Sequence, residues 1–355
     1  MCGLELKRGI RRRNMHGTGK DLGHFSEKVP PQALSQARKV AAALAKTQKV
    51  LVLGHVGADG DVAGSSLGLA QALRELGKKV TVYNEAPYPE TFHWLAGGKS
   101  VKHELGPRVR FDATVSVDAA DPARLGKHFP DPERRGTFIW VDHHRIDPPP
   151  GDINYIDLTA AAVGEQIAQI LRAMKHPLSK KVAECLYVSL MTDTGTFRYA
   201  NTSVRAFNLA GELVKSGVNP WDMTEKVLES QAPQRMLLLQ RIMPSLFLSG
   251  CGRYGSFYVR QIDQKAVGAK LEHVHGLVNH IRATKGVEVA AIFVENDAGI
   301  KVSFRSKGHV SCQPILKKLG GNGHRNAGSI VLKGSKKQVV AQVYQALELA
   351  MPQRT

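Results

Sequence analysis

The chain has 355 residues, which is too many for one ordinary domain and predicts two. Its 49 Lys and Arg residues exceed its 31 Asp and Glu residues by a net charge of +18, which favours polyanionic partners such as nucleic acids and nucleotides. No segment approaches the roughly 18 apolar residues of a membrane span, so a membrane protein is excluded.

The first part of the chain predicts a basic tail followed by an α/β domain. Residues 1–30 mix Gly, Arg and Lys and end in Val-Pro-Pro, which is typical of a flexible tail. They lack the apolar core of a secretory signal, and the four scattered cysteines predict a reduced, cytoplasmic protein. Beyond them, short apolar runs alternate with segments of helical periodicity, as in parallel βα units. The expected strands are 50–54, 78–84, 112–117 and 137–141, and the expected helices are 31–48, 64–76, 160–174, 179–191 and 203–216.

We therefore expect a catalytic domain over residues 31–218, with a parallel sheet and helices on both faces. A Met- and Leu-rich stretch, residues 219–249, predicts a connecting helix at about 220–245 and a linker. From residue 246 the apolar alternation predicts hairpins, one of them closed by the turn 296–299. Further helices are expected at about 272–284, 311–319 and 335–350. Residues 250–355 therefore predict a second, smaller α/β domain.

Acidic residues and histidines follow four separate apolar segments. In chain order they are His55, Asp59, Asp61, Asp118, Asp142, His143, His144 and Asp193. Because ligands gather at the carboxyl ends of the strands in an open parallel sheet, these side chains can converge. Mixed carboxylate and imidazole ligands suit divalent ions, with Mn²⁺ preferred and Mg²⁺, Co²⁺ or Zn²⁺ as alternatives.

These residues are too many for one ion. Two ions that share a bridging carboxylate are a common arrangement for phosphoester hydrolysis. Carboxylates this close would repel one another strongly without cations. One Asp after a strand is more often a helix cap, and one His is more often structural, so the prediction depends on their joint occurrence.

Other catalytic motifs are not expected. The segment 17–20, GTGK, lacks the spacing of a phosphate-binding P-loop. No GxSxG nucleophile elbow is present. Instead, Gly64, Ser65 and Ser66 are predicted to begin a helix whose N-terminal amides face anionic groups. The predicted chemistry is attack on phosphorus by a hydroxide that bridges two metal ions, with a nucleoside oxygen as the leaving group.

Four segments of the first domain, HVGADGD, SVDAAD, VDHH and TDTGTFRY, together resemble the DHH family of phosphoesterases. The segment 320–329, GGNGHRNAGS, resembles the glycine-rich signature of the DHH-associated domain. The matches lie in the family's order and cover about residues 35–350. Size and the lack of further domains look most like the short nano-RNase/pAp phosphatase branch, whose members hydrolyse short oligonucleotides and 3′-phosphoadenosine 5′-phosphate (pAp).

The resemblance implies a role for each matched residue. One Mn²⁺ would be held by His55, Asp59 and Asp118. The second would be held by Asp61, Asp118, His143 and Asp193, with Asp118 bridging. Facing the phosphate as a donor or acid, His144 would complete a catalytic set with Asp118 and His143. One position of this domain departs from the family pattern, because Ala58 stands where proline is frequent.

The second domain is expected to hold the rest of the substrate, through Arg305, Ser306, Gly321, Gly323 and His324. Glycines allow backbone amides to approach a phosphate closely, although a plain turn would also use them. Arg305 at a strand end suits a bidentate phosphate contact, with a surface role as the alternative. Arg198 is a weaker candidate. Asn322 replaces a usual glycine of the family signature.

The expected function is metal-dependent hydrolysis of oligoribonucleotides of roughly two to five nucleotides, including pApA- and pGpG-type dinucleotides, and of pAp. An aromatic content of 6 % disfavours the stacking groove that a long single strand needs. The alternatives are a cyclic-di-AMP phosphodiesterase, a phosphatase specific for pAp, a single-strand exonuclease of the same family, or a non-catalytic nucleic-acid-binding protein. The expected partners are short RNA or nucleotides, and a homodimer is left open.

Overall fold

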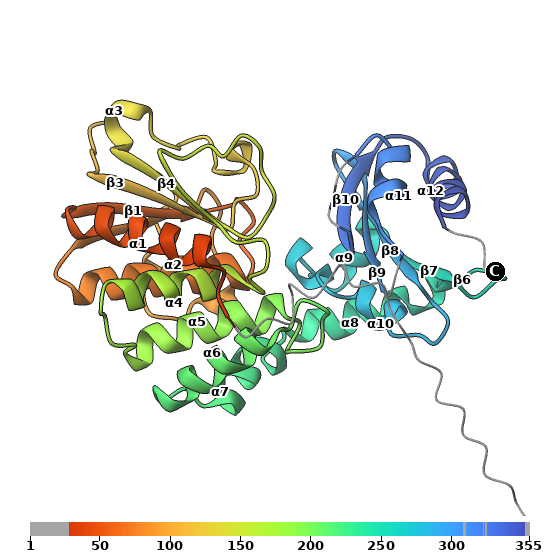
Figure 1. Cartoon of the computed structure of the whole chain (residues 1–355). Coiled ribbons are helices and arrows are strands. Elements are labelled where there is room, and N and C mark those ends of the chain that lie inside the picture. Colours follow the sequence, from red (N-terminus) through yellow and green to blue (C-terminus); the bar gives the residue numbers. More distant parts are fainter. Residues whose placement is uncertain (1–27, 308–309, 322, 324, 352–355) are drawn as a thin grey trace, which may run out of the picture. The chain divides into compact units, whose positions relative to one another are not determined.

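The computed structural model describes residues 28–307, 310–321, 323 and 325–351, so most of the predicted N-terminal tail lies outside the described residues. The chain divides into two compact units, Met1–Ser230 and Gln231–Thr355 (Figure 1). Within the described part of the chain, no helix is both long and apolar enough to cross a membrane.

Unit 1 is built on a five-stranded sheet in which all neighbouring strands are parallel. The strand order is β2-β1-β3-β4-β5. The strands are β1 (Lys49–Gly54), β2 (Lys79–Tyr83), β3 (Ala113–Val117), β4 (Thr137–Asp142) and β5 (Ile153–Ile156). The central strands β1, β3 and β4 are almost wholly buried, which explains why they read as continuous apolar runs. The predicted parallel α/β class is confirmed, but the long helices cover only one face of the sheet, whereas helices on both faces were predicted.

One face of this sheet carries the long helices (Figure 1). They are α1 (Pro31–Ala45), α2 (Gly60–Glu75) and α4 (Val163–Ala173), with α5 (Lys180–Asp193) packed on α2 and α4, and α6 (Val204–Lys215) packed on α5. The other face buries an aromatic cluster that includes Tyr83, Phe138 and Trp140. The segments near that cluster are loops with short helical turns, Pro122–Arg124 and α3 (Pro132–Arg135).

Unit 2 contains a second five-stranded sheet, with the order β10-β9-β8-β7-β6. Its strands are β6 (Phe247–Leu248), β7 (Tyr254–Val259), β8 (Val289–Asn296), β9 (Gly299–Ser306) and β10 (Ala327–Leu332). Only β7 and β8 are parallel, and both predicted hairpins are present. The helices of this unit are α8 (Pro233–Ile242), α9 (Gln261–Ala266), α10 (Val278–Arg282), α11 (Gln313–Lys318) and α12 (Lys336–Ala350). Neither β5 nor β10 was predicted.

The helix that follows the HVGADGD segment begins earlier than predicted. The helix α2 starts at Gly60, because the Asp59 carboxylate accepts hydrogen bonds from the amides of Asp61 and Val62 and caps it. Ser65 and Ser66 consequently lie inside α2 and are fully buried. The prediction that Gly64, Ser65 and Ser66 begin this helix is therefore wrong.

Two predicted helices are interrupted. The connecting helix expected at 220–245 consists of α7 (Pro220–Thr224), a π-helical turn (Glu225–Glu229) and α8, with a break before Pro233, which occupies the first turn of α8. The helix expected at 272–284 is divided into a 3₁₀ turn, Leu271–Val274, and α10. Gly276 lies between them with a φ of 78°, a left-handed conformation that ends a helix.

Candidate metal centre

The predicted ligands come from loops that leave adjacent strands at one edge of the unit 1 sheet. His55 follows β1, Asp118 follows β3, and His143 follows β4. These three strands are neighbours in the order β1-β3-β4. Parallel strands deliver the residues after their ends to the same edge, so the topology brings the three side chains together.

A first group of ligand atoms comes from His55, Asp59 and Asp118, which offer atoms within 4.8 Å of one another. His55 Nε2 lies 3.7 Å from Asp59 Oδ2 and 3.9 Å from Asp118 Oδ2. Ligand atoms bonded to one ion at about 2.1 Å lie about 3 to 4 Å apart. The spacing therefore fits one ion, and it is too wide for direct hydrogen bonds.

A second group comes from Asp61, His143 and Asp193, again within 4.8 Å. His143 Nε2 lies 3.7 Å from Asp193 Oδ2 and 3.5 Å from Asp118 Oδ1. The two oxygens of Asp118 thus face different histidines. The structure brings all six predicted ligands together, with Asp118 between the two groups.

The Asp118 carboxylate is buried and incompletely hydrogen-bonded. Its side chain is 5 % exposed, and Oδ1 has no hydrogen-bond partner among the described residues. A buried carboxylate oxygen without a donor costs free energy unless a cation or proton binds it. This orphaned oxygen, with the donor set around it, fits a divalent ion.

The backbone at this point is left-handed at residues that are not glycine. Asp118 has a φ of 51° and Ala120 a φ of 59°, and each such residue costs on the order of 1 kcal/mol or more. The turn is held by two hydrogen bonds to β4, because the Asp118 amide donates to Val141 O and the Ala120 amide donates to Asp142 Oδ2. This left-handed backbone conformation directs the Asp118 side chain toward the neighbouring ligands.

Hydrogen bonds set the tautomers of two histidines. His55 Nδ1 lies 3.1 Å from Val56 O, and His143 Nδ1 lies 3.1 Å from Ala160 O. A carbonyl oxygen only accepts, so each Nδ1 carries a proton and each Nε2 is the nitrogen available to a metal ion. These Nε2 atoms face the carboxylates.

The carboxylates raise one another's pKa. Burial, and next the charge of Asp193, raise the pKa of Asp61 to about 7. Burial raises the pKa of Asp193 to about 6, with His143 opposing the shift. The pKa of Asp118 is raised well above its usual range by burial and by Asp61. Burial lowers the pKa of His143, but the carboxylates of Asp118, Asp193 and Asp61 outweigh burial and raise it. The cluster thus retains protons that a metal ion would displace.

We expect Mn²⁺ affinity to rise as the pH is raised through about 6 to 7, where Asp193 and Asp61 titrate. Below that window an ion must displace protons from the carboxylates in order to bind, which weakens binding by up to tenfold per proton and pH unit.

The stability of the metal-free protein should change with pH in the opposite direction. Asp61, Asp118 and Asp193 bind protons more tightly in the folded than in the unfolded chain, so their contribution to stability declines as pH rises from about 4 through 7. Calorimetric Mn²⁺ titrations and urea unfolding at pH 5.5, 6.5 and 7.5 measure both trends, and a pH-independent affinity would contradict this prediction.

A stripe of glycines lets the helices α2 and α5 approach closely. A Cβ atom on Gly64 would lie 2.3 Å from Cys185 O, and one on Gly60 would lie 2.3 Å from Thr192 Oγ1. The contact brings Asp61 of α2 against Ser189 of α5, whose hydroxyl donates to the Asp61 carboxylate. Close helix packing therefore places Asp61 near Asp193, which ends α5.

The residue Asp142 was expected at this edge but without a defined role. Its buried carboxylate accepts hydrogen bonds from His144 Nδ1 at 2.7 Å, from the His144 amide at 2.9 Å and from the Ala120 amide at 2.7 Å. It thereby orients His144, which forms a third group within 4.8 Å with Asp118 and His143. Burial raises the pKa of Asp142, but hydrogen bonds and the charge of His144 lower it overall.

Sequence reasoning did not identify the groups that hold the ligands in place. The segment 157–163 contacts two of the ligands, His143 through Ala160 O and Asp61 through the Val163 amide, and Ser189 donates a second hydrogen bond to Asp61. Ser189 lies one helical turn before Asp193, so its position on the ligand face of α5 was a usable signal. The backbone contacts leave no such signal, because any residue type supplies them.

Unit 2 contains the remaining predicted residues. Arg305 and Ser306 end β9, and Ser306 N donates to Asn326 O in the segment that leads into β10. Gly323 forms a bridge with Gly328, and a Cβ on it would lie 2.4 Å from a Leu316 methyl group. The structure therefore places Arg305, Ser306 and Gly323 around the neighbouring ends of β9 and β10, and Gly321 follows α11, where its amide donates to Leu316 O. His324 and Asn322 lie outside the described residues. In unit 1, Arg198 donates to the Gly195 carbonyl.

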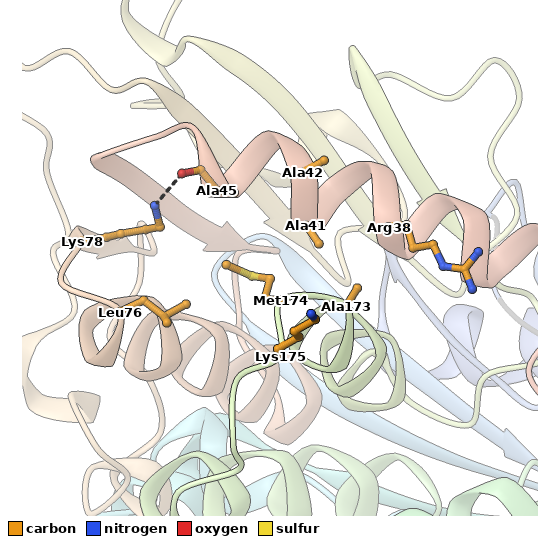
Figure 2. A pocket seen from close by; sticks show the side chains of 9 residues that line it. All are labelled: Arg38, Ala41, Ala42, Ala45, Leu76, Lys78, Ala173, Met174 and Lys175. Carbon is orange, nitrogen blue, oxygen red and sulfur yellow. Dashed lines mark hydrogen bonds between the residues drawn. The ribbon is translucent and has the colours of Figure 1, made fainter.

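A surface pocket of about 480 Å³ lies away from the metal centre (Figure 2). Its lining includes Ala41 and Ala45 of α1, Met174 after α4 and Lys78 before β2. These residues flank the ends of α1 and α4 and the start of β2, so the pocket lies at the opposite edge of the sheet. It contains none of the predicted site residues.

Comparison with known families finds one matching domain family in each of the two units. The DHH family, N-terminal domain, matches residues 49–190, and the DHHA1 domain matches residues 257–350. The bifunctional oligoribonuclease and PAP phosphatase NrnA of Thermus thermophilus is 30 % identical over 306 residues, which are 86 % of this chain and 90 % of that protein. The protein of the same name from Bacillus subtilis is 27 % identical over 274 residues, covering 76 % of this chain and 85 % of that protein.

Solved structures show the same fold. An exopolyphosphatase-related protein from Bacteroides fragilis superposes with a TM-score of 0.83 at 24 % identity, covering 89 % of this chain and 96 % of that chain. RecJ from Thermus thermophilus, in complex with Mn²⁺, superposes with a TM-score of 0.55 at 13 % identity, covering 94 % of this chain and 57 % of that chain.

Proposed function

Since the chain belongs to the DHH family of phosphoesterases, we propose that it hydrolyses short oligoribonucleotides of roughly two to five nucleotides, and pAp, with two divalent ions bound at the unit 1 centre. The NrnA relatives, named as oligoribonucleases and PAP phosphatases, match over most of their length and support this substrate class. Mn²⁺ is the proposed ion. The scattered cysteines favour action in the cytoplasm.

The position of Asp118 carries this proposal. Its two oxygens face two separate ligand groups, and one of them is buried without a hydrogen-bond donor among the described residues. We assign His55, Asp59 and Asp118 to one ion, and Asp61, Asp118, His143 and Asp193 to the other. Ions bound there would supply an activated water and neutralise the charge that develops on the phosphoryl oxygens.

The protein's own residues prepare the site for phosphate. The backbone carbonyls of Val56 and Ala160 hold the His55 and His143 rings with Nε2 toward the ligand groups. His144 is assigned as the proton donor for the leaving oxygen. The Asp142 carboxylate accepts the Nδ1 proton of His144, which fixes the ring and leaves Nε2 to exchange a proton with the substrate.

Unit 2 is proposed to bind the phosphate and base of the second nucleotide. Lys301, Arg305 and Arg235 place positive charge near His275, and burial followed by these charges lowers the pKa of His275. Arginine side chains and glycine-rich backbone are both suited to binding phosphate. We assign Arg305, Ser306, Gly321, Gly323 and His324 to substrate binding.

Purified protein with Mn²⁺ should release mononucleotides from pApA and phosphate from pAp, and chelation with EDTA should abolish both reactions. Turnover should decrease when the RNA exceeds about five nucleotides, because no stacking groove is expected for a longer strand. A length series from two to 24 nucleotides, with pyrophosphate and cyclic-di-AMP as comparison substrates, measures this. Equal rates on a dimer and on a long strand would contradict the proposal. Faster turnover of cyclic-di-AMP would favour the cyclic dinucleotide as substrate.

A further inference from the structure

We propose that Arg205 is a positioning residue of the metal centre, acting through the segment 157–163. The inference rests on the proposed function, because it takes His143, Asp61 and Asp193 as metal ligands. Arg205 lies on α6, and within the described part of the chain its side chain pairs with Asp157, Glu165 and Thr159, none of which is a predicted ligand. Its effect therefore depends on what it holds.

The Arg205 guanidinium joins two buried carboxylates. Its Nη2 lies 3.0 Å from Asp157 Oδ2 and 2.8 Å from Glu165 Oε2. The three side chains are 6 %, 2 % and 3 % exposed in the order Arg205, Asp157, Glu165. Asp157 follows β5 and Glu165 lies in the first turn of α4, so the guanidinium connects the two ends of the intervening loop.

The same three side chains also bind that loop directly. Arg205 Nη1 donates to Thr159 Oγ1 at 2.9 Å, and Thr159 donates to Asp157 Oδ1 through its hydroxyl at 2.6 Å and its amide at 2.9 Å. Glu165 Oε1 accepts from the Ala161 amide at 3.0 Å. The loop conformation is therefore fixed by hydrogen bonds to charged groups, which are stronger than those between neutral groups.

The fixed loop contacts two predicted ligands through its backbone. Ala160 O accepts the Nδ1 proton of His143 at 3.1 Å, and the Val163 amide donates to Asp61 Oδ2 at 2.8 Å. A third contact runs through Asn201, whose side-chain amide donates to Ala161 O at 3.0 Å and to Asp193 O at 3.1 Å. All three ligands of the second group thus depend on this loop.

The buried cluster of Arg205, Asp157 and Glu165 contributes little net stability, because its charges lose their hydration on folding. Desolvation of a buried ion pair often equals or exceeds its Coulombic gain, and well-packed apolar side chains would hold two helices at least as firmly. The arginine's planar fork can hold two carboxylates and a hydroxyl in fixed directions, which apolar side chains cannot do. The geometry indicates that this cluster serves to hold the loop in one position.

The variant Arg205→Lys tests this inference. Lysine keeps the positive charge that the two acids require, but its single ammonium cannot reproduce the fork. We expect Mn²⁺ affinity, measured by calorimetry without substrate, to fall about 10- to 100-fold, the usual effect of losing a group that orients a metal ligand. Excess Mn²⁺ should restore part of kcat. The matched control is Arg172→Lys, because Arg172 pairs with Glu212 and joins the same helices, α4 and α6, at an exposed position away from the loop.

The outcomes separate the inference from the proposed function. Wild-type affinity in folded Arg205→Lys, or an equal loss in Arg172→Lys, would overturn the positioning role alone. If Arg205→Lys does not fold, Thr159→Ala takes its place, since it removes the two hydrogen bonds of the Thr159 hydroxyl and leaves both ion pairs. Unchanged Mn²⁺ affinity in Thr159→Ala would then overturn the inference. A wild-type protein that binds no Mn²⁺ overturns the proposed function and the inference together.

Discussion

Replacing Asp118 with Asn should lower the turnover of pApA and pAp by about 10³-fold or more, while the protein remains folded. The change keeps the size of the side chain and removes the one carboxylate that faces both ligand groups. Loss of a ligand shared by two ions removes several kcal/mol of charge stabilisation in the transition state, and each 1.36 kcal/mol is about a factor of ten. Steady-state kinetics with saturating Mn²⁺ measures the loss.

The same variant should change stability in opposite directions with and without metal. In EDTA the metal is absent, and pH 8 lies above the pKa of about 6 for Asp193 and of about 7 for Asp61. Under these conditions Asp118→Asn removes repulsion between buried carboxylates. We therefore expect a gain on the order of 1 kcal/mol or more in urea unfolding. With Mn²⁺ the wild type should be the more stable protein, because the ion binds only its folded state. Asp222→Asn, on α7, is the control and should have the same small effect with and without metal, because the new amide oxygen can still accept the hydrogen bond from Asn219. A destabilised Asp118→Asn in EDTA would contradict the repulsion argument.

Replacing Gly64 with Ala should destabilise unit 1 by several kcal/mol. The added Cβ would lie 2.3 Å from Cys185 O and 2.6 Å from Ser189 N, which are backbone atoms of α5 and cannot rotate away. Overpacking of a tight core costs about 1–3 kcal/mol and sometimes more, because the backbone must shift. The helices would separate, so the Ser189 contact to Asp61 and the Mn²⁺ affinity should be lost as well.

The matched control is Gly211→Ala on α6. An added Cβ at Gly211 has no atom within 4 Å, so alanine should stabilise the helix by about 0.5–1 kcal/mol through its higher helix propensity. Urea unfolding of both variants compares the same chemical change in two environments. Equal stability of Gly64→Ala and the wild type would show that α2 and α5 are not in close contact in solution.

The sequence predicts the ligands of this centre better than it predicts their surroundings. The buried strands β1, β3 and β4 are continuous apolar runs, and each is followed directly by a polar side chain, so both the strands and the convergence of His55, Asp118 and His143 were predictable. The start of α2 was not, because Asp59 was assigned as a ligand and the alternative role of a helix cap was set aside. Its carboxylate has two oxygens, of which Oδ1 caps the helix and Oδ2 faces His55.

The strands and contacts that the sequence did not predict leave only weak sequence patterns. β5 has only 4 residues, and both β5 and β10 are only partly buried, so their apolar periodicity is slight. Arg205 was also missed. Its partners Asp157 and Glu165 are far from it in sequence, and a buried ion pair between segments leaves no local signal. The Ala160 and Val163 contacts are made by backbone atoms, which no residue type indicates.

The order of the ligands along the chain has a consequence for synthesis in the cell. His55 lies near the beginning of unit 1 and Asp193 ends α5, with the intervening strands and helices between them. A nascent chain therefore cannot assemble the second ligand group until almost all of unit 1 has left the ribosome. Unfinished or truncated products would carry no active nuclease among the RNA of the translation machinery.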